Sequence, residues 1–520
     1  MYSVKRWRGA LVVAATALVM SACGGGGSGS GDDASEGDPV SGGSVEIIQM
    51  SEPRILDPAT MNNALATNAI VGNALFGTLL SDKADGTFDY VLAESLETSD
   101  DGTTWRLTLR DGLTFSDGSP LDAEDVAFNW ERIKDPALGS SSRPAALYVE
   151  SMEADGQVLR FTLTEPVANF GMMITYYALN WIAKPEALEA GQAEFDKDPI
   201  GAGPFVLKSW TRGGKMVLKK NTGYFDDPRP YLDELVLSAN GDEGQRFSTV
   251  ESGGADATAS SSAAYFKHGM DKGLKGTKLD LSGGITMWMN ARFAPFDDDR
   301  AREAVAKGID VDAVNEAAYE GIGVGPDTMF VESSPFYNDT PLTAHDKAGA
   351  QKLFDELADD GKPLDFTITA YQTSESRRVA EAFQAQLSSF DNVKVDVEVL
   401  DFPAATAKVN AREFQMAPGG IGFIDPEPLV YQNLHSESAG SYSGVRDAQL
   451  DAALEKGRLS SDLEERKAAY GVVAERFAAV NPAIFYTRYT NGIAYDSHVA
   501  GFEQYGNSST RVDGVWTTKK

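Results

Sequence analysis

The 520-residue sequence has few of the side chains that carry redox, nucleophilic or metal chemistry. It contains one cysteine, Cys23, and four histidines that are far apart, His268, His345, His435 and His498. A single cysteine excludes an internal disulfide framework. Histidines distant in sequence can still meet in space, but their spacing favours no metal site. We therefore expect no disulfide, no bound metal and no cofactor.

Catalytic signatures are also missing. The patterns GxSxG, GxxxxGK[ST], HExxH and CxxC do not occur, so the sequence offers no nucleophile elbow, phosphate loop, zinc helix or dithiol motif. With 77 acidic residues in the chain, a single pair of carboxylates carries no information. We predict a protein that is not an enzyme, and keep a secreted hydrolase as the remote alternative.

Basic residues are scarce relative to acidic ones. The chain has 46 lysines and arginines and a formal net charge of −31. Such a field repels phosphate backbones, so we expect no nucleic-acid partner. An apolar fraction of 42% is nevertheless that of a globular protein.

The N-terminal apolar run is too short to span a bilayer, which takes roughly 20 residues. It covers residues 10–20, follows the basic residues Lys5, Arg6 and Arg8, and precedes Ser21-Ala-Cys23. This order of a basic start, a short apolar run and small residues predicts a signal peptide over residues 1–22. The glycine- and serine-rich stretch over residues 23–43 then predicts a flexible tether.

The most informative stretch is residues 92–126, LAESLETSDDGTTWRLTLRDGLTFSDGSPLDAEDV. Trp105, Leu107 and Leu109 alternate with polar residues, which predicts a strand with one buried face. We expect the extended chain to resume over residues 113–115. Carboxylates from Asp122 onward predict the first turn of a helix.

The same stretch resembles the signature of the family 5 extracellular solute-binding proteins, the dipeptide, oligopeptide and nickel binders that feed ABC importers. Leu109-Arg110-Asp111-Gly112, Asp117-Gly118 and Ala123-Glu124-Asp125-Val126 all fall on that signature. Leu56-Asp57-Pro58-Ala59 and Gly201-Ala-Gly-Pro-Phe205 also match family segments. The resemblance covers residues 43–505.

The resemblance implies an α/β, two-lobed periplasmic-binding-protein-like fold (type II, large cluster with an extra inserted subdomain), with a hinge between the lobes. We place the first interlobe crossing at Met287-Trp-Met-Asn290. The expected domains are lobe I over 44–76, 201–283 and 484–520, an inserted subdomain over 77–200, and lobe II over 284–483.

Periodicity supports the second lobe independently. Residues 364–370 and 393–399 are typical of strands, with an amphipathic helix between them, which predicts a parallel pair with a right-handed crossover. A long amphipathic helix is expected around residues 450–480. The region over residues 169–182 is apolar and aromatic, which indicates core.

Residues 21–23 resemble a bacterial lipobox, which implies that Cys23 becomes the lipidated N-terminus of an extracytoplasmic protein anchored to the cell membrane by that lipid alone. The alternative is an ordinary secretory signal with an incidental cysteine.

By the same resemblance, the function expected is the substrate-binding protein of an ABC importer. It would capture a small solute, first of all a di- or oligopeptide, in an interlobe cleft and deliver it to the permease subunits. We expect a monomer. A receptor for a sugar, an opine or a metal chelate would use the same architecture, and a surface adhesin or signalling receptor is a further alternative.

One segment is a candidate ligand site, Gly419-Gly-Ile-Gly-Phe423-Ile-Asp425-Pro426. It stands where peptide-binding members of the family have "GW..DY.DP", in which an aspartate pairs with the peptide's ammonium. Here Phe423 replaces the tryptophan and Asp425 is the only carboxylate. Asp425 is therefore either an amine anchor or a turn aspartate before proline.

Aromatic and basic residues give weaker candidates. Trp288 and Tyr486 lie at the proposed crossings and Tyr148 in the inserted subdomain, so their rings could line the cleft or belong to the core. Arg377 or Arg378 could meet a ligand carboxylate, or could be solvated at the start of a helix.

Overall fold

A computed structural model describes residues 37–64, 68–83, 86–100 and 102–519. Residues 37–520 form one compact unit. The predicted signal peptide, Cys23 and most of the predicted tether lie outside the described residues. Within the described ranges, no helix is both long enough and apolar enough to cross a membrane.

The first lobe is built on a seven-stranded sheet with the order β12-β18-β11-β1-β10-β9-β8. Its central strand β1 pairs in parallel with β10 and β11. The strands are β1 (Ser44–Gln49), β8 (Phe205–Trp210), β9 (Met216–Lys220), β10 (Glu234–Ala239), β11 (Ala257–Ser260), β12 (Lys275–Lys278) and β18 (Gly492–Tyr495).

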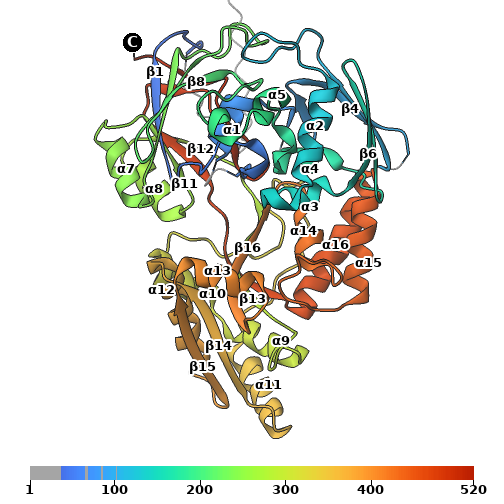
Figure 1. The fold of residues 1–520 in the computed structure, drawn as a ribbon. Helices are drawn as coiled ribbons and strands as arrows, with labels where there is room; N and C mark the ends of the chain where they lie inside the picture. The colour runs from blue at the N-terminus through green and yellow to red at the C-terminus, as the bar shows by residue number, and fades with distance from the viewer. Residues whose placement is uncertain (1–36, 65–67, 84–85, 101, 520) are drawn as a thin grey trace, which may run out of the picture. The chain divides into compact units, whose positions relative to one another are not determined.

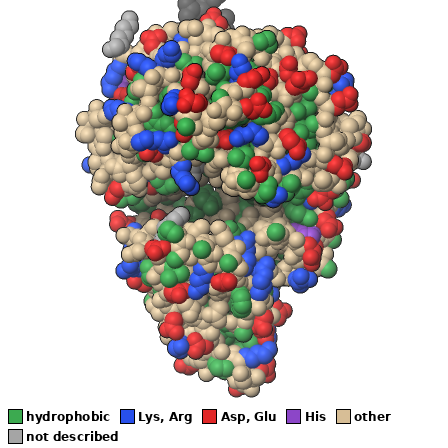
Figure 2. Space-filling view, in the orientation of Figure 1, with side chains coloured by type: hydrophobic (Ala, Val, Ile, Leu, Met, Phe, Trp, Pro, Cys, Tyr) green, Lys and Arg blue, Asp and Glu red, His purple; other side chains and the backbone are tan. Residues whose placement is uncertain are grey.

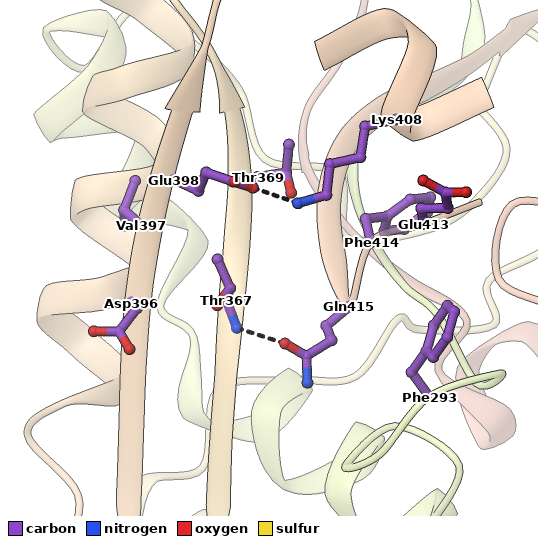
Figure 3. Close-up of a pocket in the computed structure, with 10 residues that line it drawn as sticks. All are labelled: Phe293, Thr367, Thr369, Asp396, Val397, Glu398, Lys408, Glu413, Phe414 and Gln415. Atoms are coloured by element: carbon purple, nitrogen blue, oxygen red, sulfur yellow. Dashed lines mark hydrogen bonds and ion pairs between the residues drawn. The ribbon is translucent and has the colours of Figure 1, made fainter. Parts of the chain in front are cut away.

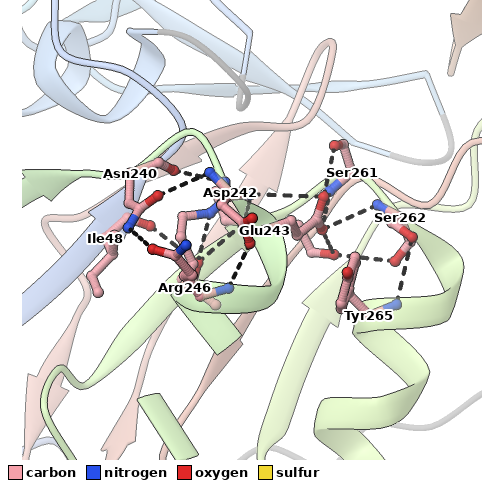
Figure 4. A network of polar contacts seen from close by, with 12 residues as sticks. Ile48, Asn240, Asp242, Glu243, Arg246, Ser261, Ser262 and Tyr265 are labelled. Atoms are coloured by element: carbon pink, nitrogen blue, oxygen red, sulfur yellow. Dashed lines mark hydrogen bonds and ion pairs between the residues drawn. The ribbon is translucent and has the colours of Figure 1, made fainter. Parts of the chain in front are cut away.

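Helices α7 (Glu243–Glu251) and α8 (Ala263–Asp271) are tied to the sheet by a polar network (Figure 4). Glu243 accepts hydrogen bonds from the Ser260 hydroxyl at 2.7 Å and the Ser261 N–H at 3.1 Å. The buried Arg246 donates to the carbonyl oxygens of Asn240 and Ala259. These groups satisfy one another, so the network holds the helices in place.

The inserted subdomain carries a four-stranded antiparallel sheet with the order β4-β5-β7-β6. Its elements are β4 (Ala93–Thr98), β5 (Thr104–Leu109), β6 (Val149–Asp155), β7 (Val158–Leu163), α2 (Ala123–Ile133) and α4 (Phe170–Tyr176). The predicted strand with one buried face is confirmed in β5. The predicted helix start is confirmed as well, since Asp122 and Asp125 form a reciprocal capping box.

Residues 113–115 are extended, as expected, but they form only an isolated bridge and not a full strand. Thr114 bridges to Pro120, and the Phe115 N–H donates to the Ser119 carbonyl at 2.9 Å across a tight turn in which the Gly118 N–H donates to the Phe115 carbonyl. Phe115 also enters the core. That core is shared with the first lobe, because Trp130 and Phe161 belong to the same cluster as Val45 and Ile493. Residues 169–182 are largely buried, as predicted.

The second lobe is built on a five-stranded sheet with the order β15-β14-β16-β13-β17. β14 (Leu364–Tyr371), α12 (Ser374–Leu387) and β15 (Val393–Leu400) form the predicted parallel unit. The remaining strands are β13 (Ser282–Met289), β16 (Met416–Phe423) and β17 (Ala483–Thr487).

Helices cover both faces of this sheet (Figure 1). One face packs on α9 (Asp299–Gly308), α10 (Val311–Tyr319), α11 (Lys347–Asp359) and α12. The other packs on α14 (Leu429–Leu434), α15 (Ala448–Leu459) and α16 (Leu463–Val480). The single helix expected around 450–480 is therefore two, because Asp462 caps a new helix after a break.

The chain passes between the two sheets at residues 279–281 and again at 488–491. Residues 287–289 were predicted at the first crossing, but they lie inside β13, which pairs with β16 and β17. Tyr486 was also expected at a crossing, but it lies inside β17, which pairs with β13. The return to the first sheet comes after Thr487 rather than at residue 484.

Candidate ligand-binding site

The central strand β16 has one open edge. Along one side β16 pairs with β13 over its whole length, and along the other it pairs with β14 only at Met416. The Asn290 N–H donates to the carbonyl of Gln415, which lies opposite it, at 2.9 Å. In an antiparallel pair, residues that bond to the partner strand alternate with residues whose N–H and C=O groups point away from it. Gly420 and Gly422 therefore direct their N–H and C=O groups away from β13. We call these two residues the glycine edge.

The next outward-facing N–H, that of Ile424, donates to the Tyr176 hydroxyl of α4 at 3.0 Å. No strand among the described residues pairs with the edge between Met416 and Ile424. The glycine edge thus offers main-chain donors and acceptors beside a contact between the two lobes. Figure 2 shows a hollow between the two lobes, with hydrophobic side chains in it.

Aromatic rings explain why glycine stands at these positions. A Cβ atom on Gly420 would lie 2.0 Å from the Tyr489 hydroxyl, and one on Gly422 would lie 2.5 Å from the Tyr489 ring. On the opposite face, a Cβ atom on Gly419 would lie 2.3 Å from Trp288 Nε1. Only glycine lets both rings approach the strand this closely.

The aromatic group continues beyond the strand. Trp288 stacks on Tyr442 with centroids 5.7 Å apart, and the Arg412 guanidinium lies 3.8 Å from the Tyr442 centroid. Burial, with Tyr442 nearby, raises the pKa of Tyr489 to about 12, so its hydroxyl is a neutral donor at physiological pH. Trp288 Nε1 is buried and donates to no acceptor among the described residues.

Asp425 is already paired with a cation. It is 2% exposed and accepts two hydrogen bonds from Arg466, at 2.9 and 2.5 Å. Asn169 donates to it at 3.1 Å, and its Oδ1 accepts from the Glu427 N–H at 2.9 Å, as in a turn aspartate. This carboxylate is not free to meet a ligand ammonium in this arrangement.

A second arginine joins the lobes beside Asp425. The break between α15 and α16 places Arg458 and Arg466 against the segment that follows β16. Arg458 donates to Glu165 of the inserted subdomain at 2.9 Å and lies 3.6 Å from the buried Glu427. Burial raises the pKa of Glu427 to about 7, although the charge of Arg458 acts in the opposite direction.

Tyr148 takes part in the same contact, because the Arg458 guanidinium lies 4.8 Å from its ring and 4.4 Å from the Tyr431 ring. Among the predicted ligand residues, Tyr148 is therefore at an interface between lobes. Arg377 and Arg378 are exposed in the first turns of α12.

The other aromatic candidates are core residues here. Phe423 is fully buried against Phe330, with centroids 5.7 Å apart. Tyr486 is 3% exposed and packs on Phe383 at 5.9 Å. Because helices cover both faces of the sheet, side chains of its central strands point into one core or the other. The expectation that these rings line the cleft does not fit this arrangement.

A groove elsewhere in the second lobe differs from the glycine edge. A groove of about 580 Å³ lies between β14, β15 and residues 413–415, where the Thr367 N–H donates to Gln415 at 2.9 Å and Lys408 pairs with Glu398 (Figure 3). The Thr367 N–H and the Lys408 ammonium in this groove therefore already have partners. Among the described residues, no group of three histidine, cysteine, aspartate or glutamate side chains could hold a metal ion.

The sequence pointed to the segment over 419–426 but not to its partners. Tyr176, Tyr489 and Arg466 come from three other parts of the chain and stand in no motif. The run of glycines was the available signal, since glycine within a strand marks a close approach of another group.

Comparison with known proteins identifies the family. The family model of the bacterial extracellular solute-binding proteins, family 5 Middle, matches residues 87–443. The chain belongs to this family. Members of this family are extracytoplasmic solute-binding proteins.

Two relatives are distant in sequence. The glutathione-binding protein GsiB of Shigella flexneri is 28% identical over 334 residues, which are 62% of this chain and 63% of that protein. Protein XP55 of Streptomyces lividans is 27% identical over 426 residues, 77% of this chain and 76% of that protein. The matched part of the chain thus spans less than two thirds of GsiB.

Two solved structures have the same fold. DppA from Helicobacter pylori, in complex with the peptide STSA, has a TM-score of 0.77 at 23% identity, covering 92% of this chain and 99% of that one. AgaA from A. tumefaciens R10, in complex with agropinic acid, has a TM-score of 0.76 at 24% identity, with coverages of 92% and 99%. The predicted type II periplasmic-binding-protein-like fold is confirmed.

Proposed function

We propose that this chain is the lipid-anchored substrate-binding component of an ABC importer, and that it captures a peptide-like solute between its two lobes. The observation that carries the proposal is the glycine edge of β16. The family supports the class of protein, and relatives whose names refer to glutathione or peptides support the class of solute.

An extended peptide can add to an open strand edge through its main chain. Gly420 and Gly422 supply N–H and C=O groups of the kind that a peptide backbone pairs with, and they carry no side chain that would discriminate between ligands. Tyr489 flanks one face of the strand, and the fully buried Trp288 packs on the other. Such a site would hold peptides of varied sequence.

A second candidate solute is a small non-peptide molecule such as an opine, a sugar or a metal chelate. It is favoured by two observations: Asp425 is occupied by Arg466, and the partly exposed Tyr442 and Arg412 form an aromatic and cationic surface near the strand. AgaA, one of the structural neighbours, was solved in complex with agropinic acid.

Capture by two lobes requires that the solute bind the closed arrangement better than the open one. The contacts of Arg458 with Glu165 and of Tyr177 with Gln432, at 2.9 Å each, join the lobes in the arrangement described above. In the proposed cycle, the permease recognises this closed form of a monomer held to the membrane by lipid on Cys23.

Native mass spectrometry of residues 41–520, before and after unfolding and refolding, tests the solute class. A co-purified mass that fragments as a peptide, and that is absent after refolding, is the expected result. A sugar, opine or chelate mass would replace the peptide proposal with the second candidate. The variant Gly420→Ala should lose the co-purified mass, because its Cβ meets Tyr489.

Gly471→Ala is the matched control, since a Cβ atom there has nothing within 4 Å. Full retention of the peptide by Gly420→Ala, with the fold intact, would remove the glycine edge as the site.

A further inference from the structure

Asp82, at the end of β2 (Leu80–Asp82), is a buried carboxylate with one unused oxygen. Asp82 is 4% exposed. Oδ1 accepts the N–H of Gly506 at 2.8 Å, whereas Oδ2 is buried and accepts no hydrogen bond from the described residues. Burying an unpaired carboxylate oxygen is costly, so this arrangement calls for a partner.

Asp82 also lacks the cation that the other buried carboxylates have. Among the described residues, four further carboxylates are buried, and each faces an arginine. The pairs are Asp57 with Arg132, Asp425 with Arg466, Glu427 with Arg458, and Asp513 with Arg511. No lysine or arginine of the described residues pairs with Asp82.

The surroundings of Asp82 favour a positive charge. Burial raises its pKa to about 6, and the negative charge of Asp425 adds to the rise, while the Gly506 N–H and the nearby Thr175 hydroxyl act against it. The Thr175 hydroxyl donates its proton to the Met172 carbonyl at 3.1 Å, so it does not occupy Oδ2. Asp425 and Tyr176 are the titratable groups that face it. Since Arg466 neutralises Asp425, one negative charge at this contact between the lobes stays uncompensated.

Tyr176 connects Asp82 to the glycine edge. The charge of Asp82 acts on the Tyr176 phenol, whose pKa burial raises, and the Tyr176 hydroxyl accepts the Ile424 N–H at 3.0 Å. Ile424 follows Gly422 by two residues on the same side of the strand. The carboxylate thus stands near the end of the strand edge on which the ligand's main chain is proposed to lie.

We propose that Asp82 binds an ammonium group of the ligand, with Oδ2 as the acceptor. The inference rests on the proposed function, and it assigns the charge recognition to the first lobe instead of to Asp425. Holding the turn at Gly506 is a structural role, but that role uses Oδ1 alone. A cationic head at Oδ2 would complete the buried pair and join the two lobes around the ligand.

The probe is a degenerate tripeptide library, offered once with free amino termini and once N-acetylated, with lysine left out so that the terminus is the only ammonium. Refolded protein is incubated with each library at pH 7.5, and the retained peptides are quantified by native mass spectrometry. The wild type should retain free-amine peptides at least tenfold better than acetylated ones. Asp82→Asn should remove this preference.

Asp89→Asn is the matched control, because Asp89 pairs across the hairpin with Ser81 and is 53% exposed. It should keep the preference. A preference that persists in folded Asp82→Asn, or equal retention of both libraries by the wild type, would overturn the amine site while leaving the peptide function standing. Retention of neither library would overturn the peptide function and the amine site together.

A second measurement needs no variant. Because the ammonium binds the ionised carboxylate, lowering the pH from 7.5 to 5 should weaken wild-type affinity for the free-amine library about tenfold. Affinity for acetylated peptides should change little. An unchanged free-amine affinity over this range would also overturn the proposal.

Discussion

The buried pair between Asp425 and Arg466 means that the substitution Asp425→Asn can distinguish a structural carboxylate from an amine anchor. The change would leave Arg466, whose side chain is 8% exposed, facing a neutral amide. The NH2 group of that amide is a donor, so it would face the N–H donors of the guanidinium. Removing one partner of a buried ion pair costs about 3–5 kcal/mol, because the remaining charge stays buried without compensation. We expect the free energy of unfolding to fall by this amount.

Thermal unfolding followed by circular dichroism measures the effect. For a domain of about 200 residues, each kcal/mol lowers Tm by about 2–4 °C, so the second lobe should unfold about 6–20 °C earlier. Asp365→Asn is the control, since Asp365 and Lys394 form a pair that is more than 60% exposed, and Tm should barely change. Adding Arg466→Met to Asp425→Asn should recover much of the loss, because the stranded charge is gone.

An amine anchor at Asp425 predicts a different result for the same variant. An amine anchor would be held ready for the ligand, so Asp425→Asn would keep the wild-type Tm and lose peptide affinity. That outcome would refute the conclusion that Arg466 occupies the carboxylate, and it would return Asp425 to the ligand site.

Three further predictions concern other parts of the chain. The stability of Glu427→Gln relative to the wild type should rise by about 2–3 kcal/mol between pH 5 and 8, since the raised pKa of Glu427 penalises its ionised form over this window, and Arg458 keeps its hydrogen bond to Glu165 in the variant; urea titrations at pH 5 and 8 that give the same difference would contradict this. Trp130→Ala should lower the free energy of unfolding by about 3–5 kcal/mol, because a fully buried ring is lost and the Leu179 carbonyl loses its donor, whereas Trp210→Ala at a partly buried ring should cost less. Cys23→Ser should move the protein from the membrane fraction to the soluble fraction in cell fractionation, and a protein that stays in the membrane would exclude lipid on Cys23 as its anchor.

Much of the local structure follows from the sequence. The alternation at Trp105, Leu107 and Leu109 specifies β5, and the carboxylates at Asp122 and Asp125 specify the start of α2. Both features depend on neighbours within a few residues, which is the range over which periodicity and capping act. The βαβ unit of the second lobe is predictable for the same reason. The family signature depends on residue identity and is also contained in the sequence.

The partners of each side chain are decided by tertiary structure. Asp425 reads equally well as a turn aspartate or an amine anchor until the break before α16 places Arg466 against it. Trp288 and Tyr486 could line a cleft until β13 and β17 join a sheet covered on both faces. Asp82 carries no sequence signal, and only its burial without a cation marks it. Charge pairing and burial join residues tens to hundreds of positions apart, so they exist only once the lobes have folded.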